Sequence, residues 1–109
     1  MAYNQNLAQR VRDELQDAPG FQEKKMFGGV GFLVQGNMAC GVHGEDLIIR
    51  VGKDNYVKAL DQSHTRPFDM TGKPMSGWIV VVPQGVQTKS DLREWVKQGV
   101  EFARSLPAK

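Results

Sequence analysis

Apolar residues recur at two spacings along the chain, and the wider spacing predicts a helix near the N-terminus. Four of them repeat at every fourth position, the period of an amphipathic helix: Tyr3, Leu7, Val11 and Leu15. We therefore predict a helix over residues 3–17 that packs one apolar stripe onto the rest of the chain. Proline and glycine at 19–20 end this helix, because proline restricts the residue before it and glycine suits a turn.

The narrower spacing, a strict alternation, predicts a sheet between Lys24 and Val51. The alternating apolar sets are Val30, Phe32 and Val34, then Met38, Cys40 and Val42, then Leu47, Ile49 and Val51. Turn-forming residues separate the sets at 35–36 and at 43–46. We predict three antiparallel strands, with a short further strand before Gly28.

The opposite face of this predicted sheet carries small residues and one charge. Its members are Gly31, Leu33, Ala39, Gly41, Ile48 and Arg50. Such a face does not resemble a second ordinary core, so we expect it to let a helix or a partner approach closely.

The rest of the chain predicts two more helices and one more strand. Residues 53–61 form a short helix candidate, and residues 62–77 form a long loop with two prolines and two glycines. Loops longer than about 12–15 residues are uncommon and are often functional. The β-branched run at 78–82 predicts a buried strand, and Thr88 is a candidate N-cap for a last helix that Pro107 ends.

Together these elements predict one domain over residues 1–109. Its fold class is α+β, a two-layer arrangement with an antiparallel sheet of four to five strands. The sheet packs against the N-terminal and C-terminal helices. Trp95 and Phe102 share the apolar face of the last helix, so we expect both in the core.

The composition changes this interpretation little. The formal net charge of +2 is too weak to predict nucleic-acid binding without a clustered basic face. A single cysteine excludes an internal disulfide and is typical of a reducing compartment. No apolar run approaches the ~20 residues that span a bilayer, and the polar N-terminus lacks a signal region. We expect a cytoplasmic protein with no membrane partner.

A glycine-rich block at residues 26–39 is the most specific pattern in the chain. It contains Met26, Phe27, Gly28, Gly29, Gly31, Phe32, Gly36, Met38 and Ala39. With Ile49-Arg50, Pro67-Phe68, Trp78 and Pro83 at matching spacing, it resembles the N-terminal domain of the TfoX/Sxy competence-regulator family. The resemblance extends from about Lys25 to Phe102. That family often has an aromatic residue at the positions of Ala39 or Cys40, and more often tyrosine at Trp78, which concerns packing.

The resemblance implies an α+β fold and a role in regulating natural competence in bacteria. Full-length regulators of that family resemble two-domain proteins, with this domain first and a helical domain second. The chain would then be a stand-alone single-domain member, and the second domain could carry the regulatory activity.

The chain contains few candidate residues for catalysis, ligand binding or metal binding. The glycines at 28–31 lack the following helix and the lysine of a phosphate loop, so we expect a tight turn or a close backbone approach there. Cys40 alternates with core residues and predicts a buried, inert thiol. His43 and His64 lack metal-ligand spacing and are expected in solvent. We expect no cofactor, no metal and no enzymatic activity.

A surface for a partner is the remaining functional hypothesis. Its candidate residues lie at the end of the third predicted strand and in the long loop: Arg50, Lys53, Arg66, Met70 and Lys73. The main expectation is a non-enzymatic regulatory or protein-interaction module, either a monomer or a weak homodimer, with an unknown protein partner. One alternative is a nucleic-acid-binding accessory module that uses the basic residues Lys24, Lys25, Arg50, Lys53, Lys58, Arg66 and Lys73. The other is a small-ligand or enzyme-like site under the 62–77 loop.

Overall fold

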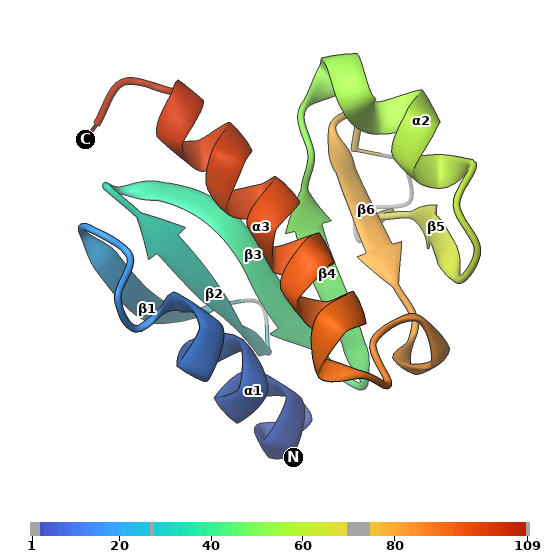
Figure 1. Cartoon of the computed structure of the whole chain (residues 1–109), viewed down its shortest axis with the longest axis horizontal. Coiled ribbons are helices and arrows are strands. Elements are labelled where there is room, and N and C mark those ends of the chain that lie inside the picture. The colour runs from blue at the N-terminus through green and yellow to red at the C-terminus, as the bar shows by residue number, and fades with distance from the viewer. Residues whose placement is uncertain (1–2, 27, 70–74, 109) are drawn as a thin grey trace.

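The fold is an antiparallel sheet of six strands with helices packed on one face (Figure 1). The computed structural model describes residues 3–26, 28–69 and 75–108. The elements are α1 (Gln5–Leu15), β1 (Phe21–Met26), β2 (Gly29–Val34), β3 (Asn37–His43), β4 (Asp46–Arg50), η1 (Lys53–Asn55), α2 (Tyr56–Leu60), β5 (Thr65–Pro67), β6 (Trp78–Val81), η2 (Pro83–Gly85) and α3 (Lys89–Ser105). The strand order is β1-β2-β3-β4-β6-β5. The predicted α+β class is confirmed, with one strand more than the expected four to five.

The additional strand is β5, in a segment for which we predicted only loop. Thr65 pairs with Val81 of β6, and its hydroxyl donates a hydrogen bond of 2.8 Å to the carbonyl oxygen of Gln62. Three residues are too few to show an alternation. The strand exists because β6 offers it a free edge, which is a contact distant in sequence.

Side-chain caps fix where the two long helices begin. The Asn4 side chain accepts a hydrogen bond of 2.9 Å from the Leu7 amide, so α1 begins after Asn4 and Tyr3 lies outside it. The Thr88 hydroxyl accepts one of 3.0 Å from the Asp91 amide, which confirms the predicted cap of α3.

Buried residues from α1, α2 and α3 join one core on the same face of the sheet. Its largest buried side chains include Phe32, Leu47, Ile49, Ile79 and Leu92. Trp95 is 7% exposed and belongs to this core, as its helical spacing predicts. Figure 1 shows α3 running obliquely across the sheet, where it packs on β3 and β4. None of the helices in the described residues is long and apolar enough to cross a membrane.

A β-bulge reverses two of the predicted face assignments. Phe32 pairs with Cys40, but Leu33 pairs with Met38, so Ala39 is the extra residue of β3. Ala39 therefore packs with Val34 toward α3, where we had expected Met38. Met38 lies opposite Leu33, on the face away from α3. The prediction was wrong here because simple alternation cannot show where a bulge falls.

The glycines of the family block have the backbone roles that we expected. Gly28 has φ +76°, a conformation that side chains rarely adopt. A Cβ on Gly29 would overlap the carbonyl oxygen of Val42 on the adjacent strand. Phe27 lies outside the described residues, and Met26 ends β1 opposite Gly29. Gly28 and Gly29 therefore form the tight entry into β2.

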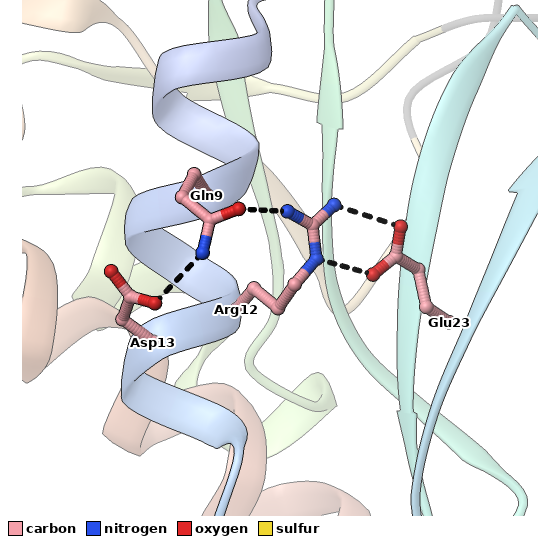
Figure 2. Close-up of polar contacts among 4 residues, drawn as sticks. All are labelled: Gln9, Arg12, Asp13 and Glu23. Atoms are coloured by element: carbon pink, nitrogen blue, oxygen red, sulfur yellow. Dashed lines mark hydrogen bonds and ion pairs between the residues drawn. The ribbon is translucent and has the colours of Figure 1, made fainter.

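An ion pair attaches α1 to the edge strand β1 (Figure 2). The Arg12 guanidinium donates two hydrogen bonds to the Glu23 carboxylate, from Nε at 2.7 Å and from Nη2 at 2.9 Å. Gln9 accepts a third hydrogen bond from Arg12 and donates one of 2.8 Å to Asp13. The hydrogen bonds from Arg12 hold the pKa of the Glu23 carboxyl below its usual value.

Candidate functional site

A cavity of about 680 Å³ opens between the second half of α3 and the end of the sheet. There β4 leaves the sheet toward η1 and β6 enters it. Figure 1 shows the chain after β4 passing beside α3 on its way to α2. The volume lies within the range of roughly 300–1,000 Å³ that is common for ligand pockets.

Arg50 lies at this cavity in contact with two aromatic rings. Its guanidinium carbon is 5.2 Å from the centroid of the Trp78 ring and 5.2 Å from that of Phe102. Arg50 is the last residue of β4, Trp78 pairs with it across the sheet, and Phe102 comes from α3. Cation–π contacts of this kind contribute about 0.5–2 kcal/mol each. Three elements thus hold one guanidinium in place.

The backbone beside Arg50 makes room for the Phe102 ring. Gly52 has φ +85°, and a Cβ on it would overlap the ring. The amides of Val51 and Gly52 both donate hydrogen bonds to the carbonyl oxygen of Gly77, at 2.8 and 3.0 Å. Phe102 is partly exposed and forms a wall of the cavity. Its predicted place in the core is therefore wrong, because the ring packs beyond the edge of the central core.

Arg50 belongs to none of the ion pairs within the described part of the chain. Those pairs join Arg12 to Glu23, Arg66 to Asp46 and Arg93 to Glu14. Arg50 also donates no hydrogen bond to a described residue. Its N–H groups therefore have no acceptor among the described residues.

The rim of the cavity carries balanced charge. Lys53 and Asp54 come from η1, and Glu101 comes from α3. Together with Arg50, these residues give two positive and two negative charges around one opening. Such a site suits a single anionic group better than a long polyanion.

The structure brings two of the five predicted surface residues together. Arg50 and Lys53 line the same cavity. Arg66 lines a second cavity of about 500 Å³ and pairs with Asp46 at 2.9 Å. Met70 and Lys73 lie outside the described residues.

Phe68 connects the two cavities. Its ring centroid is 6.4 Å from that of Trp78. The ring also lines the cavity around Arg66. Residues 65–68 are therefore held against the sheet next to the Arg50 site.

The cysteine and the two histidines considered as candidates do not line the Arg50 cavity. Cys40 is 0% exposed, which confirms its predicted burial. Burial raises the pKa of its thiol to about 12. His43 and His64 are exposed. Within residues 3–26, 28–69 and 75–108, no group of three or more potential metal-ligating side chains occurs. Lys24 and Lys25 lie on β1, three strand spacings or roughly 14 Å from β4.

Sequence reasoning missed the two aromatic partners of Arg50. Trp78 looked like the start of a buried strand, and Phe102 looked like a core residue of a helix. The available signal for Arg50 was a charged residue at the end of an apolar strand. It could not identify the rings, since both are distant in sequence.

A comparison with protein-family models identifies the fold. The model of the TfoX N-terminal domain matches residues 13–103, which is most of the chain and includes every element that forms the site. No curated protein and no solved structure matches the chain. Because this match covers most of its length, the chain belongs to the TfoX N-terminal domain family.

Proposed function

We propose that this protein is a non-enzymatic regulatory module that acts by binding another protein through the surface around Arg50. We define the Arg50 surface as Arg50, Lys53, Trp78 and Phe102. The observation that carries the proposal is a guanidinium held by two aromatic rings, with its N–H groups unused within the described residues. Membership of the TfoX N-terminal domain family supports a regulatory role, with natural competence as the process.

The residue types of this surface favour a protein partner. Tryptophan and arginine are enriched among the residues that contribute most to protein–protein binding, typically at the centre of an interface with a polar rim. Here the aromatic residues and Arg50 are partly exposed at the cavity, and Lys53 lies exposed at its rim. The arrangement therefore matches the core and rim of a small interface.

The distribution of charges supports a nucleic-acid partner less well than a protein partner. A nucleic-acid surface needs clustered cations that contact successive phosphates. Lys24 and Lys25 lie on the far edge strand, and Asp46 neutralises Arg66. Within the described residues, Arg50 and Lys53 of this basic set line one cavity, beside two acidic side chains, and Lys58 lies exposed on α2 (Tyr56–Leu60).

Affinity capture with matched variants tests the proposal. Immobilised wild type, Arg50→Met, Arg50→Lys and the control Arg93→Met are each exposed to nuclease-treated lysate of the native host. Arg93 is a suitable control because it lies on the same helix as Phe102 but pairs with Glu14 at the surface. Circular dichroism and thermal melts establish that each variant is folded.

We expect one protein to be retained by wild type and by Arg93→Met, and lost with Arg50→Met. Retention that is equal for all variants would contradict the proposal, as would a protein that is retained only from a parallel lysate without nuclease treatment. Absence of any protein retained specifically by wild type would also contradict it.

A further inference from the structure

We infer that the Arg50 surface recognises a single carboxylate group on an extended segment of its partner protein. The inference rests on the proposed function and adds the chemistry of recognition. It follows from the shape of the guanidinium, from its surroundings and from the charge balance of the cavity.

First, the in-plane N–H groups of the Arg50 guanidinium are the part that a ligand can contact. The two ring contacts hold the cation of Arg50 by its charge, with its central carbon 5.2 Å from each centroid. Such contacts leave the in-plane N–H groups for hydrogen bonds. A planar carboxylate pairs with those groups through two parallel hydrogen bonds, which is the preferred geometry of arginine with carboxylates.

The second step concerns how strongly such a pair forms. Arg50 is partly buried, and aromatic side chains border it on two sides. Charged hydrogen bonds gain strength where water is partly excluded. The rings also fix the orientation of the side chain, so less conformational entropy is lost when the ligand binds.

The third step excludes a polyanion. Asp54 and Glu101 line the same cavity as Arg50 and would repel successive phosphates. Lys53 offsets one of these negative charges. One carboxylate entering at Arg50 meets an attractive centre, whereas a chain of phosphates would also meet the acidic rim.

The fourth step explains why the carboxylate belongs to a peptide segment. The cavity extends beyond Arg50 to the polar side chains of Asn55, Ser76 and Gln98. The Nδ2 amide of Asn55 already donates to the carbonyl oxygen of Val51 at 3.4 Å. The Gln98 amide and the Ser76 hydroxyl can both donate and accept hydrogen bonds, as the backbone of an extended peptide requires. The partly exposed side chains of Trp78 and Phe102 line the cavity and offer contact area for an apolar neighbour of the acidic residue.

Selection from a random peptide library displayed on phage tests this inference without knowledge of the partner. Wild type, Arg50→Met, Arg50→Lys and Arg93→Lys serve as the immobilised proteins. The best selected peptide is then synthesised with its acidic residue intact and, as a matched control, with Glu→Gln or Asp→Asn. Binding of both peptides to wild type is measured by fluorescence anisotropy, together with binding of inorganic phosphate and of a short DNA duplex.

We expect the selected peptides to share one acidic position. Its amide replacement should weaken binding to wild type by at least about tenfold, because charged hydrogen bonds are lost. Arg50→Lys, which keeps the charge but lacks the paired N–H geometry, should weaken binding similarly, while Arg93→Lys should not change it. The amide peptide uses unmodified protein, so a folding defect of a variant cannot imitate this result.

The other outcomes separate the two proposals. Peptides that need Arg50 but share no acidic residue would overturn carboxylate recognition and leave the Arg50 surface as an interface. Peptides that bind equally to Arg50→Met, or no selected peptides at all, would overturn both. Tighter binding of the DNA duplex or of phosphate than of the acidic peptide would replace the carboxylate by a phosphate ligand.

Discussion

Replacing Gly52 with alanine should destabilise the fold strongly, although it adds only one methyl group. Gly52 has φ +85° and ψ 159°, a region that only glycine occupies readily. Forcing another residue into it costs about 1–3 kcal/mol. The new Cβ would also overlap the Phe102 ring, and overpacking of this kind costs about 1–3 kcal/mol more. The combined loss of about 2–6 kcal/mol is a large part of the 5–15 kcal/mol typical of a domain.

A double-mutant cycle separates the two contributions. Phe102→Ala removes the ring, so Gly52→Ala in that background should retain only its backbone cost of about 1–3 kcal/mol. The coupling between the two sites should therefore be about 1–3 kcal/mol. Urea unfolding followed by circular dichroism gives the four free energies of unfolding. Costs that add within about 0.5 kcal/mol would refute the contact, and a stable Gly52→Ala single variant would refute the positive φ.

Three further predictions follow from the core and the surface. Trp95→Ala should lower the free energy of unfolding by about 3–5 kcal/mol, since the indole is 7% exposed; an unchanged urea midpoint would show that the indole is not in the core. The Cys40 thiol, with its pKa raised to about 12, should react with a disulfide reagent only as fast as the domain opens; immediate reaction of the folded protein would reverse this assignment. The exposed Arg12–Glu23 pair should show a coupling of ~0.2–1 kcal/mol at pH 7. Because folding lowers the pKa of Glu23 below its usual 4.5, this coupling should be full above pH 4.5 and vanish as the pH falls through the lower folded pKa; a coupling that persists in acid would contradict it.

Periodicity predicted the elements whose burial follows the local pattern. The fourfold repeat located α1, and the alternation located β2, β3 and β4. Phe32 and Trp95 are buried as predicted because each lies on the apolar side of a regular element. The hydroxyl at Thr88 marked the start of α3 because capping depends only on residues nearby in sequence.

The sequence-based predictions were wrong where the backbone conformation depends on a strand that is distant in sequence. Ala39 and Met38 lie on the faces opposite to those predicted, because β3 has a bulge where it pairs with β2. The sequence of a single strand does not show where a bulge falls. Thr65 belongs to the sheet because it pairs with the free edge of β6. Both features depend on strand pairing, which is set by the whole sheet.

The site was predicted only in part for the same reason. Arg50 was a candidate because a charge ended an apolar strand. Its partners Trp78 and Phe102 reach it only after β4 pairs with β6 and α3 crosses the sheet. The cavity is therefore a product of tertiary structure, and the sequence contained only one of its three central residues as a recognisable signal.

Photo-crosslinking inside the native host tests the central claim most directly. A photoreactive phenylalanine replaces Gln98, which lines the Arg50 cavity, or Gln16, which is exposed at the end of α1. If a protein partner binds through the Arg50 surface, position 98 should give a crosslinked protein adduct that disappears when Arg50→Met is added. Position 16 should give no such adduct. An adduct from position 16 alone, or one from position 98 that survives Arg50→Met, would contradict the account.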